Sequence, residues 1–525
     1  MTEIDNVDVL VIGGGPVGLA AGLLLRNHGL TGIIAERRRE RSGHPKARGI
    51  RQRASELAAA WGLGDDLRAL AMPHETHRFI YTETLSGDEI ARTATLPSSG
   101  DDSWGSVPLF RVAQDRLEDV LEQHLVTSSD PASLAVVLRR GATVTSLTQD
   151  DEGLVAVLTD EAGETSQVRA RYAILADGVG SRLRRTLGIE LGSDGPAPYW
   201  HSVFWRGDLS AYVADRPAIM YYTRTGGRSL VGLAPAGDER WVTIVQNPPS
   251  EERPAPLGSD DAIALIRRAV GVDELPVDVV SSETFRISAD VASKYRSGRV
   301  FVAGDAAHAL PPTGGFGINT GFADVHNLVW KLAAVMRGKA PSVLLESYEG
   351  ERLPVAASNV AWSSGNARRM VAIKAALAAD DRVELRTLLA AQGEHVDPVA
   401  QDLGFTYVPM PEGTPPAYAV ATLGARAPHA DIMTADGIRS TIDLFEGELT
   451  LVAGTAWAAA AGELSAEFEL SVLSPPPGGR YPVGDGAVLV RPDGHVGWIA
   501  QDAQGDLTDR LRAALADVLT GRFVD

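Results

Sequence analysis

The amino-acid sequence predicts an α/β protein with a parallel, doubly wound sheet and an antiparallel β domain inserted in it. Residues 7–12 form a short apolar strand, and a glycine turn, a helix over 16–28 and a second strand at 31–37 follow it. This order with short connections is typical of a parallel sheet. Apolar strands that end in a Gly/Asp pair recur at 172–178 and 299–305. Ligands of open α/β sheets bind at such carboxyl strand ends, so we expect a ligand at these turns.

The composition is that of a soluble globular protein. The chain has 525 residues, of which 44% are hydrophobic and 22% are charged, and this length suggests about three domains. A formal net charge of -19 argues against nucleic acid or an anionic membrane as a general partner. The N-terminus is acidic where a secretory signal would be basic, and no apolar run reaches membrane-spanning length. A cytoplasmic location is therefore expected.

The chain contains no cysteine. It can therefore have no disulfide, thiol nucleophile or cysteine-ligated metal. Its histidines are scattered without the spacing of metal ligands, so no metal site is expected. Any redox chemistry must come from a bound cofactor.

The first glycine turn has the spacing of a dinucleotide site. In "VIGGGPVGLAAGLLL", Gly13 permits a tight turn, Gly15 lets a pyrophosphate approach the backbone, and Gly18 lets the helix pack closely on the strand. Glu36 ends the next strand, where a ribose-binding acid is expected. This spacing does not distinguish NAD from FAD.

The segment "VAGDAAHALPPTGGFGINTGFADVHNLVWKLAAVMRG" indicates FAD. Two prolines and four glycines follow Gly304 and Asp305 before a long apolar helix around 323–338. Glycines lose backbone entropy on folding, so their density indicates the close approach of a ligand. Asp305 can bond sugar hydroxyls, and bare amides at the helix start can stabilise the negative charge of a reduced flavin. A loop that only caps a helix would leave the Gly304-Asp305 pair unexplained.

The remaining segments divide the chain into parts. Residues 201–246 alternate apolar and polar side chains and are rich in aromatics, which predicts antiparallel strands that cover a substrate. Helical sequence continues over 342–389, prolines and glycine at 403–420 mark a candidate linker, and the chain closes with an amphipathic helix at 506–519.

Four parts are expected from these patterns. They are a cofactor domain over 1–190 that contains a substrate-domain segment at about 75–110, a β-rich substrate domain over 191–285, the second part of the cofactor domain with its helices over 286–400, and a C-terminal domain over 415–525.

Three fingerprints together resemble the para-hydroxybenzoate hydroxylase type of FAD-dependent aromatic monooxygenase. They are "GGGPVGL" with Glu36, "LADGVGSRLRR" and "GDAAHALPPTGGFGINTGFADVHNLVWKLA". The length, "HPKARGIRQRASELAAAWGL" and the C-terminal unit are most similar to the actinobacterial aromatic polyketide hydroxylases. The resemblance implies a Rossmann-like FAD-binding fold with an inserted antiparallel β substrate domain and a C-terminal thioredoxin-like domain. Without cysteine that last domain cannot exchange thiols, so packing or homo-oligomerisation is its expected role.

The resemblance also implies which residues hold the cofactor. Those expected at the FAD pyrophosphate and ribose are Gly13, Gly15, Val17, Gly18, Glu36 and Arg37. Those expected near the pyrophosphate and ribityl chain, at the adenine, and in an Asp-Gly motif shared by FAD and NADPH are Arg111, Gln114, Val144 and Asp177. Those expected around the ribityl chain and the flavin ring are Gly304, Asp305, Pro312, Gly315, Gly317, Ile318 and Asn319.

One segment concentrates basic residues in this acidic chain. It contains Arg37, Arg38, Arg39, Arg41, Lys46, Arg48, Arg51 and Arg53. Such a run is usually a solvated face, but this one follows the ribose-binding strand, and the resemblance places Arg48 between flavin and NADPH. We therefore interpret the segment as a surface that attracts NADPH. His308 is interpreted as structural rather than catalytic.

The sequence and the resemblance together predict an FAD-dependent, NADPH-using monooxygenase. Its expected substrate is a phenolic, polycyclic aromatic compound of the polyketide antibiotic type, and molecular oxygen is the co-substrate. The resemblance implies that NADPH reduces the flavin, that oxygen forms the C4a-hydroperoxide, and that an electron-rich ring carbon attacks the distal oxygen. No catalytic side chain is assigned. Baeyer-Villiger or epoxidising oxygen insertion, a flavin-dependent dehydrogenase or reductase, and a flavoprotein that only binds partners stay open as alternatives.

Overall fold

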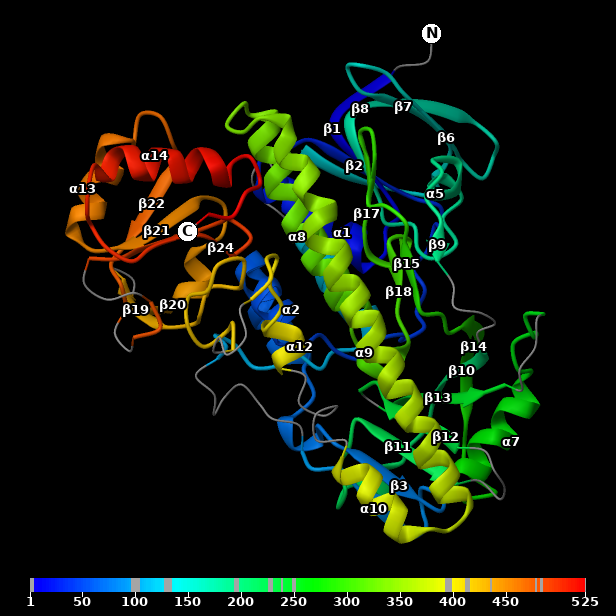
Figure 1. Ribbon diagram of the computed structural model, residues 1–525. Coiled ribbons are helices and arrows are strands. Elements are labelled where there is room, and N and C mark those ends of the chain that lie inside the picture. The colour runs from blue at the N-terminus through cyan, green and yellow to red at the C-terminus, as the bar shows by residue number, and fades with distance from the viewer. Residues whose placement is uncertain are drawn as a thin grey trace.

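The three largest sheets of the described residues, with eight, seven and four strands, belong to the main units of the fold (Figure 1). The computed structural model describes residues 4–95, 104–126, 135–192, 198–224, 230–237, 239–247, 252–391, 399–410, 416–434, 437–476, 479–481 and 485–524. Residues 96–103 of the expected substrate-domain segment and 411–415 of the expected linker lie outside the described residues.

An eight-stranded sheet forms the first layer. Its path runs β16 (Arg296–Ser297), β17 (Val300–Val302), β8 (Thr165–Leu175), β1 (Ile4–Ile12), β2 (Gly32–Glu36) and β5 (Val136–Arg140), with β6 (Thr143–Gln149) and β7 (Leu154–Thr159) off this path. The pairs β17–β8, β8–β1, β1–β2 and β2–β5 are parallel. The predicted parallel sheet is therefore confirmed, and β6, β7 and β16 add antiparallel pairs to it.

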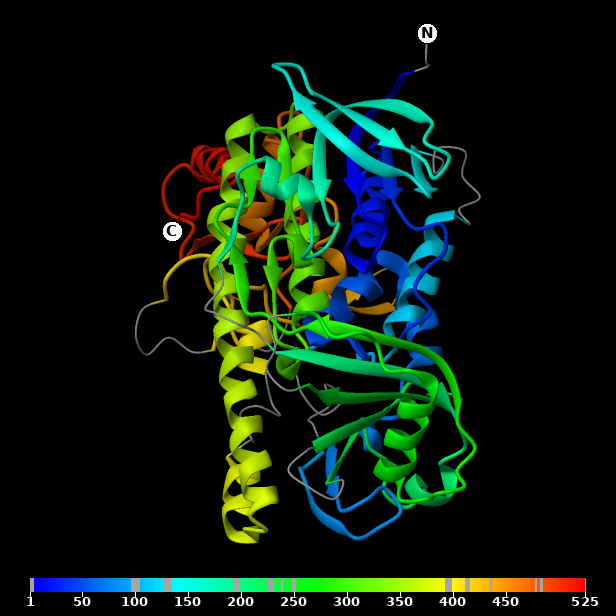
Figure 2. The same ribbon diagram turned by 90° about the vertical axis from the view of Figure 1, so that its right-hand side faces the viewer.

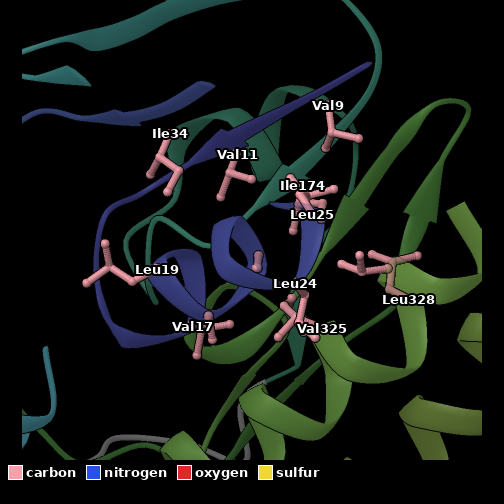
Figure 3. Packing of buried hydrophobic residues seen from close by; sticks show 14 of the residues in the cluster. Val9, Val11, Val17, Leu19, Leu24, Leu25, Ile34, Ile174, Val325 and Leu328 are labelled. Carbon is pink, nitrogen blue, oxygen red and sulfur yellow. The ribbon is translucent and has the colours of Figure 1, made fainter. Parts of the chain in front are cut away.

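The helices α1 (Pro16–Asn27) and α8 (Gly317–Met336) cover this sheet. Figure 3 shows Val11, Ile34 and Ile174 on neighbouring strands, with Leu24 of α1 and Val325 of α8 packed below them. Such β-branched side chains suit strands that are buried on both faces. Close packing also explains Gly22 inside α1, because a Cβ atom there would lie 2.4 Å from Cδ1 of Ile34.

A seven-stranded sheet forms the other end of the molecule (Figure 2). Its order is β14 (Asp278–Arg286), β10 (Tyr199–Arg206), β13 (Arg240–Gln246), β12 (Leu230–Pro235), β11 (Met220–Arg224), β3 (Phe79–Thr82) and β4 (Glu89–Arg92). Only the β11–β3 pair is parallel among these described strands. One face packs on α7 (Ser259–Val270) through an apolar core that includes Val203, Trp205 and Ile266.

Long helices connect the units. Helix α9 (Ser347–Ala378) runs beside α8 and reaches the seven-stranded sheet, where α10 (Arg382–Ala390) follows it (Figures 1 and 2). Helix α8 begins at Gly317, six residues before the predicted start near residue 323. Its first turn is closed because Phe316 O accepts both the backbone N–H and the hydroxyl of Thr320, each at 2.8 Å, which outweighs the poor helix propensity of glycine.

The C-terminal unit contains a four-stranded sheet. Its order is β22 (Leu470–Leu473), β21 (Leu449–Ala453), β23 (Ala487–Val490) and β24 (Val496–Ala500), and only β21–β22 is parallel among these pairs. Helices α13 (Thr455–Glu463) and α14 (Leu507–Val518) pack on it around Trp457 and Leu515. In Figure 1 this unit lies across α8 and α9 from the eight-stranded sheet. Its thioredoxin-like classification stays a prediction.

Shorter elements complete the chain. The helices are α2 (Gln52–Ala58), the π-helical turn η1 (Ala59–Leu63), α3 (Gly64–Leu70), α4 (Gln114–Val126), α5 (Arg182–Thr186), α6 (Ser210–Val213) and α12 (Val399–Leu403), and the strands are β9 (Leu191–Gly192), β15 (Asp290–Ala292), β18 (His308–Ala309), β19 (Asp431–Thr434) and β20 (Gly437–Ser440). Within the described part of the chain, no helix has both the length and the apolar character needed to cross a bilayer.

Candidate cofactor and substrate site

The three predicted turns meet at one edge of the eight-stranded sheet. Leu175 at the end of β8 pairs with Ile12 of β1 on one side and with Val302 of β17 on the other. The turns that follow these strands therefore start level with one another. A Cβ atom on Gly13 would lie 2.4 Å from the carbonyl oxygen of Ala176, so the first two turns are in direct contact.

The turn between β1 and α1 leaves backbone amides open. Gly13 has φ 110°, and a Cβ atom on Gly18 would lie 1.8 Å from Gly13 O, so both positions require glycine. A Cβ atom on Gly15 would meet nothing within 4 Å. Gly15 caps α1 without a side-chain hydrogen bond. The first N–H groups of α1 therefore face open space, as a phosphate site requires.

Glu36 is fixed beside this turn. Its Oε2 accepts a hydrogen bond of 2.7 Å from Gly14 N, and its Oε1 accepts one of 2.9 Å from Arg38 N. The side chain of Arg37 is exposed next to it. Ala142 N donates to Glu36 O at 2.9 Å, and this bond brings the β6 residue Val144 to the same strand end. Gly14, which sequence reasoning did not assign, thus orients the acid expected to bind ribose.

The Gly304 turn packs directly on the first turn. Gly304 has φ 59°, and Cβ atoms on Gly304 and Gly321 would lie 2.9 Å and 2.5 Å from Cγ2 of Val17. Val17 is 8% exposed, so its side chain serves this contact. A Cβ atom on Gly317 would lie 3.9 Å from Oδ1 of Asp305. The third motif therefore folds so that the start of α8 lies beside Asp305.

Asp305 is exposed beside the start of α8. Its side chain is solvent-accessible, and yet desolvation by the surrounding protein raises the pKa of its carboxyl group. No described residue forms a hydrogen bond with this carboxyl group. Nearby Pro312 and Gly315 are also exposed, and Ile318 is half-buried. Asn319 is buried, and its amide accepts from Arg51 N at 2.7 Å and donates to Gly315 O, so it holds the loop.

Asp177 is a second carboxyl group with an oxygen that lacks a partner. Burial raises the pKa of its carboxyl group, and its Oδ1 is buried without a hydrogen-bond partner among the described residues. Cβ atoms on Gly178 and Gly180 would meet nothing within 4 Å. The Asp-Gly turn therefore also borders open space.

Three arginines approach the same region. Desolvation lowers the pKa of Arg48 to about 10, of Arg51 to about 9 and of Arg111 to about 10. Their positive charges also act on one another. Nη1 of Arg48 and Nε of Arg111 are buried without partners among the described residues. Asp402 offsets part of the charge of Arg51 and Arg111, and the desolvated guanidinium nitrogens of Arg48 and Arg111 that lack partners indicate a place for an anion.

Sequence reasoning did not assign Arg51 to the site. Its backbone N–H binds Asn319, its Nε donates to Gly314 O at 3.0 Å, and its guanidinium group lies 4.3 Å from the ring centre of Phe316. These partners lie more than 260 residues away in the sequence. Gln114 holds the backbone of the basic segment, since its Oε1 accepts a hydrogen bond of 3.2 Å from Ala47 N.

Ion pairs and burial take up part of the basic segment, and its role in attracting NADPH stays a prediction. Arg39 pairs with Glu161 at 3.0 Å, and Arg41 pairs with Glu122 at 3.3 Å. Arg53 is buried and donates to Asp493 O at 2.8 Å. The acidic partners lie on other elements, so much of the positive charge is neutralised locally.

The hydrogen-bonding and charged groups of this site fit FAD. Open amides at the start of α1 suit its pyrophosphate, Glu36 suits a ribose, unpartnered Asp305 suits a ribityl hydroxyl, and the arginines suit the anionic parts of the cofactor. His308 is fully buried with Nε2 2.7 Å from Oδ2 of Asp324. The described residues contain no cluster of ligands that could hold a metal ion.

The seven-stranded sheet faces this site with a row of aligned residues. Ser202, Ile244, Gly232 and Tyr222 are successive register partners on β10, β13, β12 and β11. We call them the floor row. At about 4.8 Å per strand the row spans about 14 Å. Because side chains alternate along each strand, the row lies on the face opposite the α7 core.

The basic segment borders both ends of the floor row. His44 Nε2 lies 2.7 Å from Oγ of Ser202, and its Nδ1 lies 2.8 Å from Oγ of Ser281. At the other end, burial raises the pKa of Tyr222, and the charge of Arg48 opposes part of that rise. Tyr222 stacks on Tyr81 with ring centres 5.1 Å apart. Arg48 therefore lies near both Arg111, which is expected to contact the cofactor, and the floor row.

Comparisons with known proteins agree with this arrangement. A family model described as an FAD binding domain matches residues 6–363, and one described as the C-terminal part of an aromatic-ring hydroxylase matches residues 421–521. A tetracenomycin A2 monooxygenase-dioxygenase of Streptomyces glaucescens is 32% identical over 98% of this chain and 97% of its own length. A 4-methyl-5-nitrocatechol 5-monooxygenase of a Burkholderia species is 32% identical over 97% of this chain and 98% of its own. The solved flavin-dependent monooxygenase PieE, in complex with FAD and substrate, is 28% identical with a TM-score of 0.89 over 99% of this chain and 100% of its own.

Proposed function

This chain belongs to the FAD-binding-domain family and is an FAD-dependent aromatic hydroxylase, and we propose that it hydroxylates a phenolic, polycyclic substrate that lies along the floor row. Two relatives are named for aromatic substrates, tetracenomycin A2 and 4-methyl-5-nitrocatechol. We base our proposal on a compound of the tetracenomycin kind, because the floor row extends over four strands.

The observation that carries this proposal is the position of the 44–48 segment. It contacts Ser202 at one end of the floor row and acts on Tyr222 at the other. Of the two middle residues, Gly232 has no side chain and Ile244 offers an apolar one. A floor of about 14 Å accommodates several fused rings side by side, whereas a single phenol ring would leave most of it bare.

The protein side chains bind, orient and exclude water. The amides after Gly15, the carboxylates of Glu36 and Asp305, and the arginines would hold FAD, which when bound supplies the chemistry that activates molecular oxygen with electrons from NADPH. Arg48 would hold the oxygen of the substrate phenol through its unpaired Nη1, which favours the ionised, electron-rich form of the ring. The sheet and the cofactor domain would enclose the reacting carbon and limit the access of water.

The test is turnover with labelled oxygen gas. With a polycyclic phenol, one labelled atom should enter the product as a hydroxyl group and the other should leave as water. The O-methyl ether of that phenol should react far more slowly, because it cannot ionise. Unlabelled product with hydrogen peroxide as the only oxygen product would contradict hydroxylation, and label in a lactone ring would indicate Baeyer-Villiger insertion.

A Gly232→Val variant tests the place of the substrate. The added side chain would project from the middle of the floor row. A Cβ atom on residue 232 would lie 3.1 Å from Sδ of Met220. We expect kcat/KM for the polycyclic phenol to fall at least tenfold, while the Kd for FAD and turnover of a one-ring phenol change little. Equal losses for both substrates would contradict binding along the floor row.

A further inference from the structure

The turn that carries Asp305 is held by a buried carboxylate. We call residues 302–308 the Asp305 turn. Gly304 N donates to Oδ2 of Asp324 at 3.1 Å, and His308 Nε2 lies 2.7 Å from the same oxygen. Asp324 thus joins the two sides of the turn, while Asp305 between them has no hydrogen-bond partner among the described residues. Gly304 adopts φ 59°, so the turn conformation is specific and must be maintained.

The other oxygen of Asp324 binds a second buried charge. Nε of Arg352, on α9, donates to Oδ1 of Asp324 at 3.0 Å. Both side chains are fully buried. Burial alone would raise the pKa of Asp324, but the neighbouring charges of His308 and Arg352 hold it below its ordinary value. The carboxylate is therefore charged, and its geometry depends on Arg352.

Arg352 in turn reaches the C-terminal unit. Its Nη1 donates to Oη of Tyr407 at 3.4 Å. Tyr407 is bonded to that unit, since its backbone N–H donates to Gly424 O at 2.9 Å and its ring stacks on His495 with centres 4.3 Å apart. The Tyr407 hydroxyl thus joins α9 to the last domain.

The chain of contacts continues into the C-terminal sheet. Nδ2 of Asn327 donates to Oη of Tyr407 at 3.3 Å and to Oδ2 of Asp493 at 2.9 Å. Asp493 lies between β23 and β24, and its carboxylate pairs with Arg491 at 2.5 Å. The unbroken series of contacts is Asp493, Asn327, Tyr407, Arg352, Asp324 and Gly304.

We propose that Tyr407 is a positioning residue through which the C-terminal unit fixes the Asp305 turn and thereby sets the affinity for FAD. Without the Tyr407 hydroxyl, Arg352 loses a buried acceptor. A buried guanidinium group then gains by moving toward another acceptor, and this motion loosens its bond to Asp324. The Asp305 turn relaxes, and Asp305 no longer meets the cofactor in a fixed geometry. This inference rests on the proposed role of Asp305 in binding FAD.

The test compares half-buried Tyr407 with buried Tyr481 in the same part of the molecule. Tyr407→Phe removes the hydroxyl and keeps the ring. Tyr481→Phe is the matched control, because Tyr481 is buried and its Oη donates to Pro428 O at 2.7 Å, away from the series. For each apoprotein we would measure the Kd for FAD from flavin fluorescence, the visible spectrum of bound flavin, and the thermal midpoint.

We expect Tyr407→Phe to raise the Kd for FAD about five- to tenfold, less than the full effect of losing a hydrogen bond to a charged group, because the loss reaches the cofactor only through Arg352 and Asp324. Tyr481→Phe should change the Kd less than twofold at a similar loss of thermal midpoint. Asp324→Asn should also weaken FAD binding, and adding Tyr407→Phe to it should cause little further loss, because both act through one turn. Additive losses in the double variant, or equal Kd values for the two tyrosine variants, would overturn the inference.

Asp305→Ala separates this inference from the proposed site. If Asp305→Ala weakens FAD binding and Tyr407→Phe does not, the site is supported and the positioning role of Tyr407 is wrong. If Asp305→Ala leaves the Kd unchanged, the proposed role of Asp305 is wrong, and with it the route by which Tyr407 was inferred to act.

Discussion

Arg48 differs from the ion-paired arginines of its segment in having a buried guanidinium nitrogen without a partner among the described residues. Arg39 and Arg41 each form ion pairs, whereas Nη1 of Arg48 is buried without a partner among the described residues. Desolvation lowers the pKa of Arg48 to about 10, so the group is still charged at neutral pH. A desolvated, unpaired charge acts strongly on anything that approaches it. We therefore propose that this one residue, rather than the whole segment, attracts NADPH when the flavin is reduced, before it meets the phenol of the substrate.

An Arg48→Ala variant should slow flavin reduction by NADPH at least tenfold and raise the Kd for FAD much less. Stopped-flow absorbance at saturating FAD measures the first quantity. The control is Arg38→Ala, which removes an exposed charge from the same segment but keeps the backbone N–H that binds Glu36. Similar slowing in both variants would show that the field of the whole segment matters, as the sequence suggested.

The residues that we propose hold the cofactor could be predicted where the motif is local. Gly13, Glu36 and Asp305 each stand in a short pattern whose spacing has a physical reason. Arg51 and Tyr222 could not be found in this way. Their importance comes from partners far along the chain, such as Asn319 for Arg51, and no local pattern encodes such a contact.

At the scale of elements, the strand-turn-helix unit at the N-terminus depends on how closely α1 approaches the sheet. Gly22 lies in the middle of α1, where glycine costs about 1 kcal/mol relative to alanine in an exposed helix. Its Cβ position is only 2.4 Å from Cδ1 of Ile34. Packing, not helix propensity, therefore decides the residue at this position.

We expect Gly22→Ala to destabilise the protein by about 1–3 kcal/mol, because the helix must move away from β2. The control is Gly350→Ala in α9, where a Cβ atom would meet nothing within 4 Å and the helix should gain up to about 1 kcal/mol. Urea unfolding at saturating FAD measures both. Stabilisation by both substitutions would contradict the packing account.

Element boundaries were less predictable than element types. The sequence predicted the helix at 323–338, but α8 begins at Gly317, because the Thr320 hydroxyl and amide close the first turn on Phe316. A glycine-rich segment has low helix propensity, and only the local bonds and the tertiary packing of Gly321 on Val17 reverse it.

At the scale of the whole molecule, buried charges join the C-terminal unit to the long helices. Glu351 of α9 accepts from Nη2 of Arg491 at 2.7 Å and from Nζ of Lys331 at 2.8 Å. Glu351 and Arg491 are 140 positions apart. No periodicity relates such residues, and this interface could not be read from the sequence. Its charges are exposed by less than 5%, so each depends on its partners.

This interface should make the stability of the protein depend on pH. Burial alone would raise the pKa of Glu351, but Arg491 and Lys331 hold it well below its ordinary value of 4.5. In the unfolded chain Glu351 takes up a proton near pH 4.5, while in the folded chain it does so only at lower pH. The contribution of Glu351 is therefore complete above pH 4.5 and is lost as the pH falls through the lower folded-state value.

A Glu351→Gln variant should be less stable than the parent by roughly 3–5 kcal/mol at pH 7, because buried Lys331 loses its ion-pair partner and buried Arg491 keeps only Asp493. The difference should shrink as the pH falls from 4.5 toward the folded-state pKa of about 2, because over this range the unfolded parent takes up a proton that the folded parent does not. Thermal midpoints of both proteins at pH 7, 5.5, 4.5 and 3.5 measure this. Glu118→Gln is the control of opposite sign, because burial raises the pKa of Glu118, so acid should stabilise the parent relative to that variant. If the difference between Glu351→Gln and the parent stayed constant down to pH 3.5, the carboxylate would not be the charge that holds the C-terminal unit on α9.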